Sequence, residues 1–166
     1  LVDNSKTGIN FSNELVDTKE HSIFLYANYY GGAGVGIGDF DNDGLEDIFF
    51  AANLLDDKIY KNLGNFEFED KTKMSGIINN GSWSTGVTVA DVNNDGLLDI
   101  YVSCELYDDA PVLRRNKLYI NQGSFKFKES ASEWGVDVDR RTRHAVFFDY
   151  NNDGLLDLYL LNHPPN

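Results

Sequence analysis

One acidic nine-residue segment occurs three times in the chain and constrains the fold more than any other feature of the sequence. The copies align without gaps at residues 39–47, 91–99 and 149–157, with starting points 52 and 58 residues apart. The similarity continues further, because residues 58–68 match residues 117–127 position by position. A period of this length is typical of a repeated supersecondary unit. The sequence therefore predicts tandem modules of about 50 to 60 residues.

Each module is expected to contain four short strands. An alternating apolar run precedes each acidic segment, and a run rich in β-branched and aromatic residues follows it. These runs are residues 34–38, 86–90 and 144–148 before the segments, and residues 47–51, 99–103 and 157–161 after them. A third and a fourth strand are expected at residues 58–61 and 66–70 of the first module, joined by a tight turn. No convincing amphipathic helix is found, so the predicted class is all-β.

Four-stranded modules repeated with this period predict the blades of a β-propeller, because one such sheet cannot bury both of its faces until neighbouring sheets stack against it. The expected division is residues 1–30 as a lead-in or as strands that complete a blade, 31–80 as blade 1, 81–138 as blade 2 and 139–166 as a partial blade 3. Residues 8–12 and 23–30 could form strands. About two and a half blades are then present, whereas propellers close with about four to eight. We therefore expect a longer parent chain.

A glycine face is expected on the first strand of blade 1. Gly34, Gly36 and Gly38 alternate with Val35 and Ile37, so the glycines share one face of the strand. Bare glycine in a strand indicates that another backbone packs very close to it.

The acidic segments have the pattern of a hard-cation site. Oxygen donors at positions 1, 3, 5, 7 and 9 of a tight loop can surround an ion, and calcium accepts the resulting number of ligands more readily than magnesium does. Position 6 is glycine, where the chain turns sharply. Position 7 would contribute its main-chain carbonyl. The expected ligands are Asp39, Asp41, Asp43, Leu45 and Asp47; Asp91, Asn93, Asp95, Leu97 and Asp99; and Asp149, Asn151, Asp153, Leu155 and Asp157.

Two other interpretations of these segments are less favourable. An EF-hand requires a glutamate at position 12 and flanking helices, but that position is Phe50, Val102 or Leu160. A simple polar turn is common for one such segment but improbable for three that share every donor position. The chain has 27 acidic against 14 basic residues, for a net charge of −13. Up to three Ca²⁺ would relieve the repulsion within the loops, and the first loop, with one more carboxylate, is expected to bind most tightly.

The pattern Asp-x-Asp/Asn-x-Asp-Gly-x-x-Asp between two strands resembles the FG-GAP/VCBS repeat of integrin α-subunit propellers and of many secreted bacterial proteins. The Lys-x-Tyr-x-Asn-x-Gly-x-Phe-x-Phe runs that begin at Lys58 and Lys117 are similar to those of the cartilage acidic protein and ASPIC/UnbV-like branch. This resemblance covers residues 31–166. It implies a seven-bladed propeller, calcium in the blades, and an extracellular or cell-surface location, which in bacteria includes outer-membrane lipoproteins.

The function expected is therefore a binding or scaffold module rather than an enzyme. Nucleophile-elbow, phosphate-loop and zinc-protease motifs are absent from the sequence. The alternatives are the propeller region of a carbohydrate-active enzyme of the polysaccharide lyase type, and a lectin. Expected partners are a protein or glycan at the cell surface and the remaining blades. The acidity disfavours nucleic acid, and no apolar run approaches the roughly 20 residues of a membrane span.

An insertion in blade 2 is a candidate partner surface. Residues 99–117 exceed the corresponding stretch 47–58 by seven residues, which lie within residues 106–115. The insertion would expose Tyr107, Asp108, Asp109, Arg114 and Arg115 on a loop, where propellers vary their partners. A surface extension without a function remains the alternative.

Overall fold

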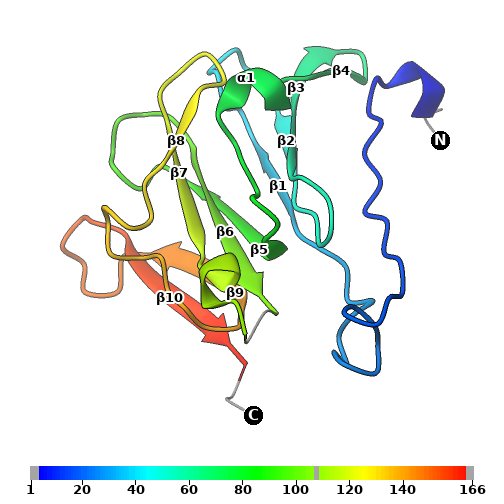
Figure 1. Ribbon diagram of the computed structural model, residues 1–166. Coiled ribbons are helices and arrows are strands. Elements are labelled where there is room, and N and C mark those ends of the chain that lie inside the picture. The colour runs from blue at the N-terminus through cyan, green and yellow to red at the C-terminus, as the bar shows by residue number, and fades with distance from the viewer. Residues whose placement is uncertain (1–3, 107–108, 164–166) are drawn as a thin grey trace.

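The structure is a computed structural model that describes residues 4–106 and 109–163, and it is built from antiparallel sheets (Figure 1). Two sheets have four strands in sequential order, and a third pair of strands follows them. The strands are β1 (Val35–Gly38), β2 (Asp47–Phe50), β3 (Lys58–Gly64), β4 (Glu67–Asp70), β5 (Trp83–Ala90), β6 (Asp99–Glu105), β7 (Lys117–Asn121), β8 (Phe127–Glu129), β9 (Thr142–Phe148) and β10 (Asp157–Asn162). The predicted all-β class and partial propeller are confirmed.

The helical segments are single turns. They are η1 (Asn4–Lys6), α1 (Thr72–Ser75) and η2 (Pro111–Arg114). The α1 turn ends at Gly76, whose left-handed φ of 79° stops the helix. No helix in the described part of the chain has the length and apolar character needed to cross a membrane.

The strands expected before β1 are not formed. Within the described residues 4–34, residues 8–12 belong to no strand. Residues 23–30 contain turns, in which the main-chain N–H groups of Tyr26 and Tyr29 donate to the carbonyls of Ser22 and Tyr26. The aromatic run instead anchors this segment, because the rings of Tyr26 and Tyr29 lie 5.8 and 5.4 Å from that of Trp83. The segment runs alongside the first sheet in Figure 1, and the ring of Phe11 stacks on that of Phe50 at 4.7 Å.

The core lies between the stacked sheets. One cluster joins the first sheet to the second through Phe40, Phe49, Ile59, Ile100, Val102, Tyr119 and Phe127. Another joins the second sheet to the β9–β10 pair through Tyr101, Leu118, Ile120, Ala131 and Ala145. Every residue of β6 and β7 is buried, because the second sheet is covered on both faces. This is the packing that successive propeller blades require.

The glycine face predicted on β1 meets the innermost strand of the next sheet. A Cβ added to Gly34 would lie 2.7 Å from both the carbonyl oxygen of Thr85 and the amide nitrogen of Val87. The same contact recurs one sheet later, where a Cβ on Gly86 would lie 2.5 Å from the carbonyl oxygen of Arg143. Adjacent inner strands therefore approach each other where the sequence has glycine.

Candidate metal centres

The three acidic loops connect the first strand of each sheet to the second, and their backbones have one conformation. Position 4 has φ values of 58°, 57° and 58° at Asn42, Asn94 and Asn152. Position 6 also lies in the left-handed region, with a φ of 88° at Gly44. Asparagine and glycine are the residues that adopt this conformation most readily. Asparagine at position 4 is thus a second conformational signal, which the sequence analysis overlooked.

In each loop, the carboxylates at positions 1 and 5 accept hydrogen bonds from main-chain N–H groups of the same loop. Asp39 accepts hydrogen bonds from the main-chain N–H groups of Asp43 and Gly44, at 3.0 and 2.7 Å. Asp91 and Asp149 repeat this pair of bonds at 2.8 to 3.1 Å. In every loop the position-5 carboxylate accepts from the N–H of the position-7 leucine at 2.9 Å; these leucines are Leu45, Leu97 and Leu155. The carboxylates are therefore held in place by the turn itself.

The position-9 carboxylates fasten the loops to the sheets. Asp47 is fully buried and accepts from the N–H groups of Phe40 and Asn62 at 2.9 and 2.8 Å. Asp99 accepts in the same way from Val92 and Asn121. Burial raises the pKa of Asp47 to about 6, against the opposing effect of its two backbone hydrogen bonds. Asp157 is exposed and accepts from Tyr150 at 2.9 Å.

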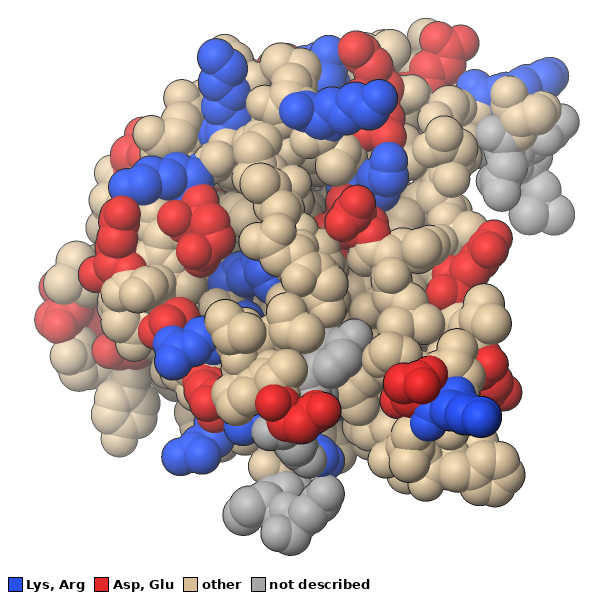
Figure 2. All heavy atoms as spheres, in the orientation of Figure 1, with Lys and Arg blue, Asp and Glu red and all other residues tan. Residues whose placement is uncertain are grey.

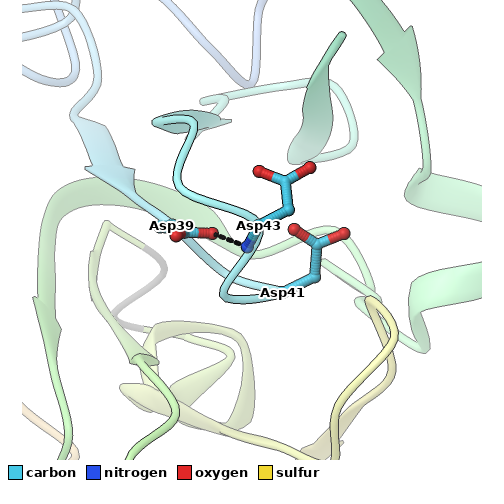
Figure 3. Close-up of side chains that lie close together, drawn as sticks. All are labelled: Asp39, Asp41 and Asp43. Atoms are coloured by element: carbon cyan, nitrogen blue, oxygen red, sulfur yellow. Dashed lines mark hydrogen bonds between the residues drawn. The ribbon is translucent and has the colours of Figure 1, made fainter.

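The first loop brings three carboxylates together (Figure 3). Ligand oxygens of Asp39, Asp41 and Asp43 lie within 4.8 Å of one another. The Oδ1 atom of Asp41 is buried and has no hydrogen-bond partner. A buried carboxylate oxygen without a partner is costly unless a cation compensates for it, and all the donors are the hard oxygens that calcium prefers. The residues of this loop therefore fit a calcium ion.

A lysine also reaches the first loop. Lys61, on β3, places its Nζ 2.6 Å from Oδ2 of Asp43 and forms a second ion pair with Asp41. The hydrogen bond from Lys61 is the main reason that the pKa of Asp43 is lowered. Sequence analysis missed Lys61, although the aligned position in the second module, Ile120, differs from it in charge.

The second and third loops have an asparagine at position 3. The amides of Asn93 and Asn151 donate to Oδ2 of Asp95 and Asp153 at 2.9 Å. Among the described residues, the first loop is the group in which three acidic side chains converge within 4.8 Å. In the other two loops the position-1 and position-5 carboxylates are held by the same backbone bonds, with a neutral amide beside them.

Comparison with known proteins assigns these loops to a family. Residues 39–102 and 108–160 match the FG-GAP-like repeat, and together they make up more than half of the chain. The chain belongs to the FG-GAP-like repeat family. It is also similar to cartilage acidic protein 1 of Xenopus tropicalis, with 26% identity over 164 residues that cover 98% of this chain and 24% of the relative. For the human protein of that name, the identity is 26% over 137 residues, covering 82% of this chain and 20% of the relative.

These FG-GAP-like repeats confirm the family predicted from the three acidic segments and from the strands around them. The chain spans no more than about a quarter of the length of the cartilage acidic proteins that it matches.

Two ion pairs connect the end of the blade 2 insertion to the segment that precedes β9. Arg114 donates from Nε to Oδ1 of Asp139 at 2.6 Å, and Arg115 forms an ion pair with Asp137. Asp109 is exposed, while Tyr107 and Asp108 lie outside the described residues. The two arginines thus anchor the insertion against the segment before β9. Figure 2 shows acidic and basic side chains interspersed over the visible face.

A buried ionic cluster lies at the end of β6, away from the FG-GAP-like loops. Glu105 is fully buried and accepts hydrogen bonds from Arg143, at 2.5 Å, and from the hydroxyl of Tyr26. These residues come from the second sheet, from β9 and from the N-terminal segment. The cluster therefore joins three parts of the chain, and a charged residue at the buried end of an apolar strand was the available sequence signal for it.

Proposed function

We propose that this chain is a calcium-binding propeller segment of an exported or cell-surface protein, where it serves as a binding or scaffold module. The observation that carries the proposal is the convergence of Asp39, Asp41 and Asp43, with the unpartnered Oδ1 of Asp41, in a loop whose conformation recurs in the other repeats. Family membership supports a repeat module rather than an enzyme.

The fifteen ligand positions predicted from the sequence remain the proposed ligands. Bound calcium would supply positive charge to carboxylates that otherwise repel one another. In the first two repeats the position-9 aspartate connects the loop to the third strand of its own sheet, through Asn62 and Asn121 respectively. Ordering of a loop therefore stabilises the sheet beside it, and calcium binding is linked to unfolding.

The proposed calcium binding favours an extracellular or cell-surface location. Loops of this open type suit the high calcium concentration outside cells, where affinities of about 10⁻⁴ to 10⁻³ M suffice. Similarity to cartilage acidic protein 1 supports an exported protein. The proposed partners are a protein or a glycan and the further blades of a longer chain. We propose the same blade division, 31–80, 81–138 and 139–166, and each sheet falls within one of these ranges.

A calcium titration followed by thermal unfolding tests the proposal. At about a hundredfold excess over the dissociation constant, one site adds about 3 kcal/mol to the free energy of unfolding, so the melting temperature should rise by several degrees. Substituting the position-5 residues together, as Asp43→Asn, Asp95→Asn and Asp153→Asn, should abolish the rise. Asp109→Asn changes an exposed acid outside the loops and should preserve it. A wild-type melting temperature that calcium leaves unchanged would refute the proposal.

A further inference from the structure

We propose that Lys61 is an internal counter-cation of the first loop, so that this loop binds calcium more weakly than the second loop and depends on it less. The inference rests on the proposed function and deepens it, because it ranks the sites and names the residue that sets the rank. It runs against the order expected from counting carboxylates alone.

The position of Lys61 is fixed by both neighbouring sheets. Its ammonium contacts Oδ2 of Asp41 and Oδ2 of Asp43, and its side chain is 20% exposed. The ammonium also lies 5.5 Å from the centre of the Phe125 ring, which belongs to the second sheet's β7–β8 turn. Cations are attracted to aromatic faces at this distance. Lys61 is therefore held over the first loop rather than extended into solvent.

The second repeat lacks both members of this ion pair. Position 3 is Asp41 in the first loop and Asn93 in the second, while the aligned strand position is Lys61 in β3 and Ile120 in β7. Ile120 is buried in the core between the second sheet and the β9–β10 pair. The additional ligand carboxylate and the additional ammonium therefore occur together in the first repeat and offset each other. Counting only the proposed ligand side chains and the strand position, each repeat carries −3: four aspartates with one lysine in the first, and three aspartates in the second. Glu46, which is not a proposed ligand, adds one further negative charge to the first loop, where the second has Leu98.

An equal charge on the ligands and the strand position does not imply equal affinity for an ion. In the first loop, a calcium ion would share Asp41 and Asp43 with an ammonium group that repels it and competes for their oxygens. In the second loop, the corresponding Asp95 accepts from the neutral amide of Asn93. Two unit charges about 4 Å apart interact by about 1 kcal/mol even in bulk water and by about 4 kcal/mol near a protein surface. Removal of the ammonium should therefore tighten calcium binding at the first loop by about tenfold or more.

The test isolates each loop in the full chain. Asp95→Asn with Asp153→Asn leaves the first loop intact, and Asp43→Asn with Asp153→Asn leaves the second. Calorimetric titration with Ca²⁺ should show weaker binding in the first background than in the second. Lys61→Ile, which introduces the residue found at position 120, should lower the first-loop dissociation constant by about tenfold or more. Lys61→Gln retains a long polar side chain and should give the same direction of change if the isoleucine impairs folding.

Lys58→Ile is the matched control. It removes the same charge from the same strand, but Lys58 pairs with Asp70 at 2.9 Å and does not touch the loop. We expect it to change the first-loop affinity by less than about twofold, because the ammonium of Lys58 is paired with Asp70 and lies outside the loop, where solvent and salt screen it. Equal gains for Lys58→Ile and Lys61→Ile, or no gain for either Lys61 variant, would overturn the role of Lys61.

The two proposals fail in different ways. If neither the background with an intact first loop nor the one with an intact second loop binds calcium, the proposed function fails, whatever Lys61 does. If the first loop, with Lys61 present, binds calcium as tightly as the second loop or more tightly, only the counter-cation role fails. Melting temperatures in chelator give an independent measure, because Lys61→Gln should lower the metal-free value more than Lys58→Gln does.

Discussion

The side-chain amide of Asn121 donates to the main-chain carbonyl of Phe40 at 2.9 Å, so the end of the second sheet is hydrogen-bonded to the acidic loop of the first. The same amide also donates to the carbonyl of Leu98 at 3.0 Å. Asn62 holds the equivalent place in the first repeat, but its amide donates to Glu46 within its own repeat. Asparagine at this repeat position therefore connects the second repeat to the first, whereas in the first repeat the amide bond stays within that repeat.

Asn121→Ala should cost more stability than Asn62→Ala. Both substitutions remove the oxygen that accepts from a glycine N–H in the following turn, so this loss is common to the pair. Asn121→Ala also leaves a buried carbonyl of the neighbouring repeat unpaired, and we expect it to lower the free energy of unfolding by about 2 to 3 kcal/mol, against about 1 kcal/mol for Asn62→Ala. Urea denaturation in chelator measures both. Equal losses would show that the bond to Phe40 contributes nothing.

Alanine substitutions at Gly34, just before β1, and at Gly36 within it should differ in cost, because the added methyl groups would contact different atoms of the next sheet. At Gly34 the obstacle is the backbone of Thr85 and Val87, which cannot move without separating the sheets. At Gly36 the obstacles are side-chain methyl groups of Val87 and Val89, at 2.7 and 2.9 Å. We expect Gly36→Ala to cost about 1 to 3 kcal/mol, as for other overpacked sites, and Gly34→Ala to cost more. Chemical denaturation followed by circular dichroism gives the order, and a larger loss at Gly36 would contradict it.

The fold was predictable where local pattern and packing agree. Strand β2 was expected at residues 47–51 and is observed at Asp47–Phe50. Strand β3 was expected to end at residue 61 but continues to Gly64, because the ladder to β4 persists through an irregularity between Asn62 and Gly64. Residues 23–30 have the aromatic content of a strand, but Tyr26 and Tyr29 pack on Trp83 instead. No local signal specifies that distant contact.

The candidate site was predictable only as far as its ligands are local. Donor spacing within each loop predicted Asp39, Asp41 and Asp43, which do converge. The ion pairs of Lys61 with the first loop, and of Arg143 with Glu105, connect residues about 20 to 40 positions apart. Such partners are brought together by strand register and sheet stacking, which a single sequence does not specify.

Breaking the ion pair between Arg143 and Glu105, at the end of β6, should strongly destabilise the protein. Arg143→Met would remove the arginine from the fully buried Glu105 and leave it only the hydroxyl of Tyr26 on Oε1, while its Oε2 already lacks a hydrogen-bond partner. Removing one member of a fully buried pair typically costs about 3 to 5 kcal/mol, and because the Arg143 side chain is 31% exposed we expect a loss of about 2 to 3 kcal/mol. Arg140→Met removes the same charge from an exposed position nearby and should cost less than about 0.5 kcal/mol.

A double substitution separates the charge effect from lost packing. If the cost of Arg143→Met comes from the stranded carboxylate, then Glu105→Gln should recover part of it when the two are combined. Free energies of unfolding for the two single variants and the double variant give the coupling energy directly. Strictly additive losses would show that the pair contributes only through packing.

Asp57 should make the stability of the metal-free protein fall as the pH rises. Burial raises the pKa of this carboxyl from 3.8 to about 6, against hydrogen bonds from the main-chain N–H of Ala52 and the side chains of Asn79 and Ser84. The folded state therefore holds a proton that the unfolded state releases near pH 4. The stabilisation is complete below the unfolded pKa and is lost as the pH rises through about 6, by up to about 3 kcal/mol.

Asp57→Asn removes the titrating carboxyl, so a comparison with the wild type shows whether folding raises or lowers the pKa of Asp57. The difference in free energy of unfolding, wild type minus Asp57→Asn, should decrease between about pH 4 and about pH 7, because only the wild type loses the bound proton. Other carboxyls with a raised pKa, Asp47 and Asp99, titrate in both proteins and cancel in this difference. A difference that rises with pH would mean that Lys117 and the hydrogen-bond donors around Asp57 outweigh its burial.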